Sequence, residues 1–227
     1  MNDIKTSALF DCRVPYLSAL FSESEYPFSA VGKIKEYILS LISRGLPEFA
    51  EISDGVFVGK YVKIHKSAVI EPPAIIGDGC EIRPSAYIRG NLITGKNCVI
   101  GNSCELKNCI LLDFVQVPHF NYVGDSILGN HAHLGAGVIC SNLRTDKKNI
   151  SLHTDEGNMN TGMRKLGAII GDGTDIGCGA VLNPGTIIGR GTWVYPLVSV
   201  RGTVPCDSIV KSDKITIAKE DRTQCAE

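Results

Sequence analysis

The sequence has no surplus of charge of either sign, because its 227 residues include 23 lysines and arginines against 24 aspartates and glutamates. Polyanion-binding proteins are normally basic, so this balance argues against nucleic acid as a partner. No run approaches the roughly 20 apolar residues of a membrane-spanning helix. The opening MNDIKTSALFDC also lacks a basic region followed by an apolar one, which a secretory signal requires. We therefore expect a cytoplasmic protein with neither a nucleic-acid nor a membrane partner.

What the sequence does contain is a six-residue rhythm of aliphatic side chains. They stand at Val58, Ile64, Ile70, Ile76, Ile82, Ile88, Ile100 and Leu106, then at Leu128 and Leu134, and finally at Ile170, Ile176, Leu182, Ile188, Val194 and Val200. A fixed period of this kind is typical of an all-β solenoid, a parallel β-helix in which each coil stacks on the last. With three hexads in a coil, we expect six or seven coils over residues 51–212 and a tail over residues 213–227.

Paired cysteine motifs are absent. None of the nine cysteines forms a C-x-x-C, so a zinc ribbon or a thioredoxin-like site is not expected. Cys80, Cys98 and Cys104 instead stand four residues after a hexad start, where Ala68 and Ala86 also occur. This slot predicts small, buried and reduced side chains.

Residues 1–50 do not carry the rhythm. Residues 29–43 have apolar side chains at helical spacing, and Gly45 and Pro47 follow them. Because a solenoid needs a terminator at its open end, we expect this N-terminal helical cap to cover the first coil.

Two interruptions of the rhythm are candidates for function. The hexad due at Pro118 is missing, and the next clear start is Leu128, ten residues on. We therefore expect residues 118–125 to leave the regular coil. Residues 141–167 are polar and read as a long inserted loop, which we expect to cover the binding face or to reach a neighbouring subunit.

The stretch from Lys107 to Asn142, which contains HFNYVGD and LGAG, resembles a known family. The similarity is to the C-terminal hexapeptide-repeat acetyltransferase domain of the bifunctional glucosamine-1-phosphate acetyltransferase and N-acetylglucosamine-1-phosphate uridyltransferase, over about residues 58–205. The resemblance implies a left-handed coil, a homotrimer with sites between subunits, acetyl-CoA as co-substrate, a sugar phosphate as acceptor and no metal. The first 50 residues are too few for the uridyltransferase domain, which we do not expect here.

The resemblance also assigns roles to individual residues. His119 matches the general base, which takes a proton from the attacking amine, and the backbone N–H of Ala136 matches the oxyanion donor. The expected substrate contacts are Arg89 and Lys107 for the phosphate, Tyr122 for the phosphosugar, Asn142 near the amine and Lys148 from an adjacent subunit. Cys178 and Pro196 match positions at the acetyl-CoA site. Arg89 and Lys107 stand eighteen residues apart, which places them one coil apart on the same face.

Two alternatives stay open at this stage. His131 and His133 form an H-x-H that would place both imidazoles on one face of a strand, and with His119 they could bind zinc or iron as in β-helical carbonic anhydrases. The protein could also be a trimeric scaffold without catalysis. The sequence departs from the family at His133, Leu143 and Cys178, and it leaves open which amino sugar is acetylated.

Overall fold

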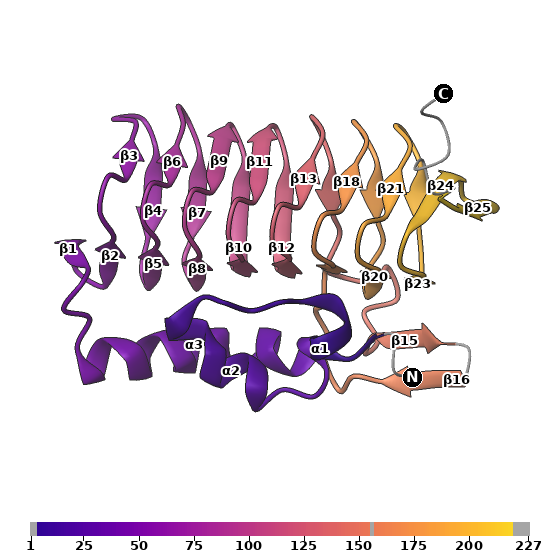
Figure 1. Cartoon of the computed structure of the whole chain (residues 1–227), viewed down its shortest axis with the longest axis horizontal. Helices are drawn as coiled ribbons and strands as arrows, with labels where there is room; N and C mark the ends of the chain where they lie inside the picture. Colours follow the sequence, from indigo (N-terminus) through magenta and orange to yellow (C-terminus); the bar gives the residue numbers. More distant parts are fainter. Residues whose placement is uncertain (1–3, 155–156, 220–227) are drawn as a thin grey trace, which may run out of the picture.

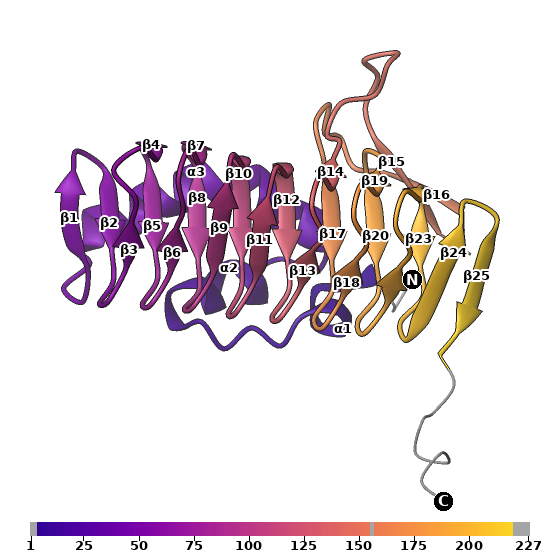
Figure 2. The same cartoon turned by 90° about the horizontal axis from the view of Figure 1, so that it is seen from above.

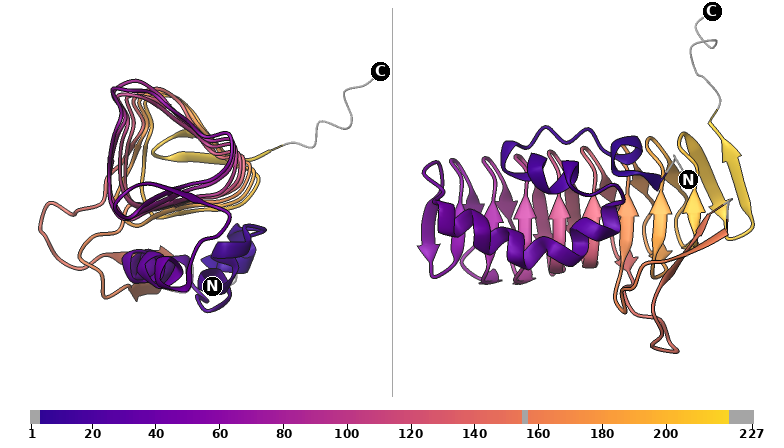
Figure 3. Two further views of the ribbon diagram at one scale, coloured as in Figure 1. Left: turned by 90° about the vertical axis from the view of Figure 1, so that its left-hand side faces the viewer. Right: turned by 90° about the horizontal axis from the view of Figure 1, so that it is seen from below.

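The computed structural model describes residues 4–154 and 157–219. A triangular solenoid of stacked parallel strands forms the main body, and the N-terminal helices lie along one of its three sides (Figure 1, Figure 3). The all-β solenoid expected from the six-residue rhythm is confirmed. Residues 220–227 of the expected tail lie outside the described residues.

Each of the three faces is a stack of short strands. The helix-covered face contains β2 (Val56–Val58), β5 (Ala74–Ile76), β8 (Leu92–Thr94), the second half of β10 (Glu105–Leu111), the second half of β12 (Tyr122–Leu128), β17 (Ala168–Ile170), β20 (Thr186–Ile188) and β23 (Thr203–Val204). The open face contains β4 (Val69–Glu71), β7 (Tyr87–Arg89), the first halves of β10 and β12, β14 (Ile139–Cys140), β19 (Val181–Leu182) and β22 (Ser199–Val200). The third face contains β3 (Lys63–Ile64), β6 (Glu81–Ile82), β9 (Val99–Asn102), β11 (Gln116–His119), β13 (His133–Leu134), β18 (Asp175–Ile176), β21 (Trp193–Val194) and β24 (Ser208–Ser212).

The coil count differs from the expected six or seven. The solenoid has about eight turns, and both of its ends finish in antiparallel pairs. β1 (Ala50–Ser53) pairs with β2, and β25 (Ile215–Ala218) pairs with β24.

The coils shorten by one residue at a corner of the solenoid. Ala74 pairs with Leu92, eighteen residues on, whereas Leu92 pairs with Cys109, seventeen residues on. The single corner residues there, Asn108 and Asp125, have left-handed φ values of 50° each, a conformation that Asn and Asp adopt more readily than most residues. The corner therefore turns with one residue fewer, and the rhythm resumes one position early.

This shortening corrects the expectation that residues 118–125 leave the coil. The apparent ten-residue gap consists of shortened corners, and the chain between them is regular. His119 is the last residue of β11 and pairs with Asn102 of the preceding coil.

The interior of the solenoid is filled by the aliphatic residues of the rhythm, together with small residues. Cys80, Cys98 and Cys104 are buried there, as their spacing predicts. The eight cysteines in the described part of the chain are all unpaired. Burial raises the pKa of the Cys140 thiol to about 12, which keeps it protonated and unreactive.

The N-terminal helices pack on a side of the solenoid and not over its open end. They are α1 (Thr6–Leu9), the 3-10 helix η2 (Pro15–Leu17), α2 (Ser18–Ser22) and α3 (Pro27–Arg44). The long helix α3 contacts β8, β10 and β12, and its end at Gly45, with a φ of 88°, agrees with the sequence.

The reason for this placement is an apolar stripe on the outside of the solenoid. Strands such as Ala74–Ile76 have three consecutive apolar residues, so the middle side chain points outward. These outward side chains form one apolar cluster with α3: Ile75, Ile93, Ile110, Ile127, Ile169 and Ile187. The expectation that the helix covers the first coil is therefore wrong, because burial of this stripe decides its position.

The contact between α3 and the solenoid predicts a stability difference along one helix. Ile34 is fully buried against the stripe, whereas Leu39 is 48% exposed. We expect Ile34→Ala to lower the free energy of unfolding by about 2–5 kcal/mol, and Leu39→Ala by less than about 0.5 kcal/mol. Chemical denaturation of the two variants measures the difference, and equal losses would contradict the packing of α3.

The long insertion is partly ordered as a hairpin. β15 (Ser151–Thr154) pairs with β16 (Gly157–Asn160) in antiparallel fashion. Ile150, Leu152 and Leu166 are buried in the same cluster as the N-terminal helices. The segment that joins β14 to β15 projects away from the solenoid (Figure 2). Within the described part of the insertion, this segment thus extends outward, while Leu152 of the hairpin packs against the N-terminal helices.

Candidate active site

The corner between the third face and the open face carries four of the predicted residues in one column, which we call the His119 column. Its members on successive coils are His119, Ala136, Cys178 and Pro196. Backbone hydrogen bonds of 2.8 to 3.0 Å join these coils. The N–H of Gly137 donates to the His119 carbonyl, that of Gly179 to the Ala136 carbonyl, and that of Leu197 to the Cys178 carbonyl. Residues 17 to 42 positions apart in sequence therefore follow one another along a single edge of the open face.

The backbone beneath His119 is held by a buried asparagine. The His119 N–H donates to Asn121 Oδ1 at 3.0 Å, and Asn121 Nδ2 donates to the Gly135 carbonyl at 2.8 Å. Asn121 is 2% exposed, whereas the His119 side chain is exposed. This bridge links the coil of His119 to the coil of Ala136 and so sets their relative position.

Two backbone features of the column suit an extended acyl donor. Among the residues that the structure describes, the N–H of Ala136 has no acceptor, so it is available to an oxyanion. Gly179 lies beside the column with a φ of 68°, and a Cβ there would come within 2.7 Å of Leu197 Cδ2. The glycine thus lets the Leu197 side chain, 83% exposed, lie along this corner as an apolar surface.

The opposite edge of the open face carries the predicted phosphate ligands. Ile88 and Leu106 are paired in register, so Arg89 and Lys107 follow them on neighbouring coils. Arg89 Nη1 bonds Glu105 Oε1 at 2.7 Å, and this hydrogen bond is the main reason that the pKa of Arg89 is raised. Lys107 is half-buried, and its ammonium makes no ion pair or hydrogen bond within residues 4–154 and 157–219. Its charge is thus available to an anion.

Next to these cations, Tyr122 and Asn142 meet at a buried carboxylate. Asn142 Nδ2 donates to Asp125 Oδ2 at 2.5 Å and to the Tyr122 hydroxyl at 3.2 Å. Asn108 Nδ2 donates to the other oxygen of Asp125 at 2.8 Å. Burial, followed by the charge of Asp125, raises the pKa of Tyr122. The amide of Asn142 is oriented by these bonds, which leaves its carbonyl oxygen as the group available to a ligand.

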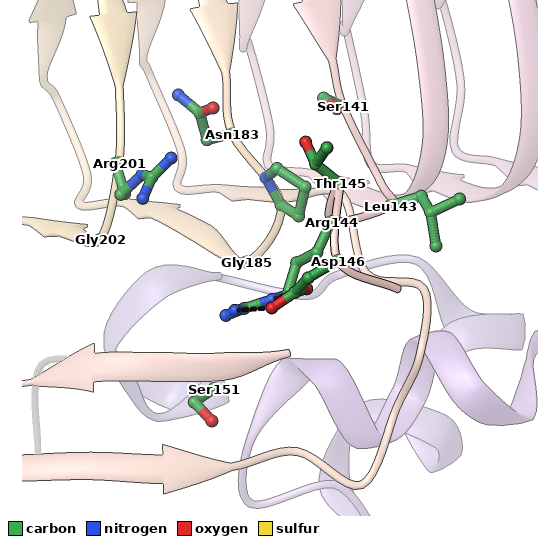
Figure 4. A pocket seen from close by; sticks show the side chains of 11 residues that line it. Ser141, Leu143, Arg144, Thr145, Asp146, Ser151, Asn183, Gly185, Arg201 and Gly202 are labelled. Atoms are coloured by element: carbon green, nitrogen blue, oxygen red, sulfur yellow. Dashed lines mark hydrogen bonds and ion pairs between the residues drawn. The ribbon is translucent and has the colours of Figure 1, made fainter. Parts of the chain in front are cut away.

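Lys148 lies in the projecting segment, apart from both edges. Its backbone N–H donates to Asp146 Oδ1 at 3.2 Å, and Arg144 grips the same carboxylate through two bonds of 2.8 and 2.7 Å. The hydrogen bond from Arg144 is the main cause that lowers the pKa of Asp146. Between this segment and the coil of Arg201 lies a polar cavity of about 350 Å³ (Figure 4).

The predicted residues therefore form two groups on the two long edges of the open face. Gly124, which is in register with Lys107, comes five residues after His119. A chain of that length spans at most about 17 Å. A substrate that uses both groups of one subunit must lie across the open face.

The three histidines of the metal hypothesis do not gather. His131 is a corner residue with a φ of 57°, not a strand residue, and its ring stacks on Phe114. His133 Nδ1 is 2.8 Å from Asp175 Oδ1. No group of three His, Cys, Asp or Glu side chains within the described ranges could hold a metal ion. The alternative of an H-x-H face on one strand is contradicted, because a corner of the solenoid lies at His131 and the strand begins only at His133.

Three polar residues of these groups were missed by the sequence analysis: Glu105, Asn121 and Asp125. A usable signal existed for two of them. Asn121 stands in an inward slot that elsewhere holds Ala or Cys, and Asp125 stands in a shortened hexad. The role of Glu105 had no such signal, because its pairing with Arg89 depends on the stacking of two coils.

Sequence comparisons show where this architecture belongs. A family model described as the GMPPB C-terminal domain matches residues 70–163. The bifunctional protein GlmU of Methanococcus aeolicus is 34% identical over 178 residues, which cover 70% of this chain and 43% of that protein. GlmU of a Methanococcus maripaludis strain is 35% identical over 211 residues, which cover 90% and 50% of the two proteins.

The chain is homologous to the GlmU proteins. The homology lies in their C-terminal hexapeptide-repeat region, which confirms the family expected from the sequence. The chain spans about half or less of the length of these curated relatives. A protein of Sulfurisphaera tokodaii, 34% identical over 147 residues covering 60% of this chain and 37% of its own, is named a bifunctional sugar-1-phosphate nucleotidylyltransferase/acetyltransferase.

A comparison with solved structures also finds matches. A point mutant of AntD, an N-acyltransferase from Bacillus cereus in complex with dTDP-4-amino-4,6-dideoxyglucose and coenzyme A, is 18% identical and gives a TM-score of 0.45. That likeness covers 73% of this chain and 84% of AntD. In the described part of the chain, no helix combines the length and the apolarity needed to cross a membrane.

Proposed function

We propose that this protein transfers an acetyl group from acetyl-CoA to the amine of an amino-sugar 1-phosphate in nucleotide-sugar biosynthesis. The observation that carries the proposal is the arrangement of the open face, with His119 and the Ala136 N–H on one edge and Arg89 and Lys107 on the other. Homology to the GlmU proteins supports the same reading, since the matched region includes both edges.

In this proposal each group has one task. Arg89 and Lys107 hold the sugar phosphate by charge-assisted hydrogen bonds. Tyr122 and Asn142 orient the sugar so that its amine faces the acyl donor. His119 takes a proton from the amine as the nitrogen attacks the thioester carbonyl. The Ala136 N–H stabilises the oxyanion, and the C–S bond then breaks to release the CoA thiolate, which takes up the proton that His119 removed from the amine.

The chain's own residues fit an acyl-CoA along the His119 column. Cys178 and Pro196 continue the column beyond Ala136, and Leu197 adds an apolar surface beside them. A narrow edge of this kind suits the thin pantetheine arm of coenzyme A. We place the thioester next to Ala136, where it can meet an amine held on the open face.

The experiment that tests the proposed function is a thiol-release assay. Glucosamine-1-phosphate, galactosamine-1-phosphate and nucleotide-linked amino sugars are each supplied with acetyl-CoA. We expect turnover with an amino-sugar 1-phosphate, and mass spectrometry of the product should show one added acetyl group. An absence of turnover with every acceptor would favour the non-catalytic scaffold.

We further propose that the active unit is a homotrimer. The helices cover one face only, so the other two faces are available for subunit contact (Figure 3). The segment with Lys148 projects outward at the edge of the open face (Figure 2), where it could bring this lysine to a neighbour's substrate. We expect multi-angle light scattering at micromolar concentration to give three times the 24.4 kDa chain mass. A monomer would contradict both the assembly and the shared site.

A further inference from the structure

An aromatic stack lies at the corner between the helix-covered face and the third face, opposite the open face. Each coil places one residue with a left-handed backbone at this corner, and Phe114, His131 and Gly173 follow one another there. The rings of Phe114 and His131 are parallel within 5°, with centroids 4.7 Å apart. That distance matches the spacing of about 4.8 Å between neighbouring strands, so the coils themselves set the stacking distance.

The stack ends at Gly173, where there is open space. A Cβ added at Gly173 would meet no atom within 4 Å. At Gly191, the next residue at this corner, the equivalent Cβ would lie 2.4 Å from Asp207 Oδ1. Space is therefore open beside His131, on the side away from Phe114, and a flat ring could continue the stack there.

The walls of this space are polar and firmly held. It is a cavity of about 480 Å³ whose lining includes Asp11, Asn130 and Asp172 as well as His131 and Gly173. Asp172 accepts the backbone N–H of Asn130 at 2.8 Å through Oδ1 and that of Asp11 at 2.8 Å through Oδ2. Asn130 Nδ2 donates to the Asp11 carbonyl at 2.9 Å. The N-terminal segment is thus tied to the corner and closes one side of the cavity.

Two cations also line the cavity. Lys96 Nζ lies 5.7 Å from the centroid of Phe114 and has no carboxylate partner among the described residues. Arg13, whose side chain is 81% exposed, pairs with Asp11 at 2.6 Å. The lining also holds three carboxylates, Asp11, Asp113 and Asp172, so Lys96 is the cation that is available to an anionic group of a flat-ringed ligand.

We propose that this corner binds a nucleotide whose base stacks on the free face of His131 above Gly173. The volume is within the range of small-ligand sites. A flat heterocycle fits the spacing of the stack, and its exocyclic amino groups can donate to Asp11 Oδ1 and Asp113 Oδ2, because the printed bonds of these carboxylates use their other oxygens. The phosphate then lies toward Lys96. The site is separate from the open face and does not rest on the proposed acetyl transfer.

The test is isothermal titration of the full chain, without acetyl-CoA, against AMP, UMP and GMP, with ribose 5-phosphate as the ligand that lacks a base. We expect saturable binding of at least one nucleotide. Ribose 5-phosphate should bind at least roughly tenfold more weakly than that nucleotide. His131→Ala should weaken nucleotide binding about 5- to 100-fold, the range that loss of one base-stacking side chain produces. Gly173→Asn should abolish it by filling the space, and Asn97 already adopts the same backbone at this corner, with a φ of 55°.

The matched control is Tyr61→Ala, which removes an aromatic side chain that is 87% exposed at the same corner of an earlier coil. This variant should bind nucleotide as the unchanged protein does. Equal affinity for ribose 5-phosphate would overturn base stacking and leave only an anion site. Undiminished binding by His131→Ala, or no binding of any nucleotide at millimolar concentration, would overturn the proposal outright. Acetyl transfer should be unaffected by either corner variant, so failure here is distinguishable from failure of the proposed function.

Discussion

His119→Ala should lower kcat for acetyl transfer by roughly 10²- to 10⁴-fold while KM for the sugar phosphate stays nearly unchanged. The imidazole is exposed at the edge of the open face, and the proposed phosphate ligands, Arg89 and Lys107, stand on the other edge. Removal of the base should therefore slow proton transfer without weakening the binding of the phosphate. Steady-state kinetics with saturating acetyl-CoA measure both constants.

The matched control for His119 is His65→Ala. His65 is another exposed histidine of the third face, three coils earlier, where its Nδ1 contacts Ser67 Oγ at 2.8 Å. This variant should keep the full kcat. If His119→Ala changes only KM, or if both histidine variants behave alike, His119 is not the general base and the acetyltransferase proposal loses its catalytic group.

His119 holds a regular position in the solenoid, which the sequence did not predict. His119 does not lie in an irregular excursion, because β11 continues through it. Its backbone is held by Asn121, whose amide also binds the coil of Ala136. These bonds fix the backbone of His119 relative to the coil of Ala136, which is the alignment that the proposed proton transfer requires.

Lys107→Ala should raise KM for the amino-sugar 1-phosphate by about 10- to 100-fold with little change in kcat. A hydrogen bond to a charged group contributes about 1.5–3 kcal/mol, and a phosphate is held alike in the ground state and the transition state. Lys107 is the better test of the two cations, because Arg89 is already paired with Glu105. The same steady-state assay, with the sugar phosphate varied, measures the effect.

The control for Lys107 is Lys63→Ala, which removes an exposed lysine from the first coil of the third face. KM should then stay as it is in the unchanged protein. A fall in kcat with an unchanged KM for Lys107→Ala would remove Lys107 from phosphate binding. Because the defects expected for His119 and Lys107 differ in kind, a shared loss of both constants in both variants would indicate a general folding defect.

The sequence by itself determined the solenoid and the placement of most candidate residues along it. A six-residue period allows only a stacked coil, and a multiple of that period puts Arg89 and Lys107 on neighbouring coils regardless of detail. Burial of Cys80, Cys98 and Cys104 followed in the same way, since each slot of a repeat has one environment. The helix over residues 29–43 and its end at Gly45 were also local properties.

Only the tertiary structure decided how these parts meet. The position of α3 depends on an outward apolar stripe that several distant strands build together, and no single strand reveals it. The pairing of Glu105 with Arg89 depends on which residues lie one coil apart. The one-residue shortening at Asn108 and Asp125 then changes the register of the later coils, which include the corner of His131. Because a local deletion shifts every later contact, the two edges of the open face could be assembled only from the stacked coils.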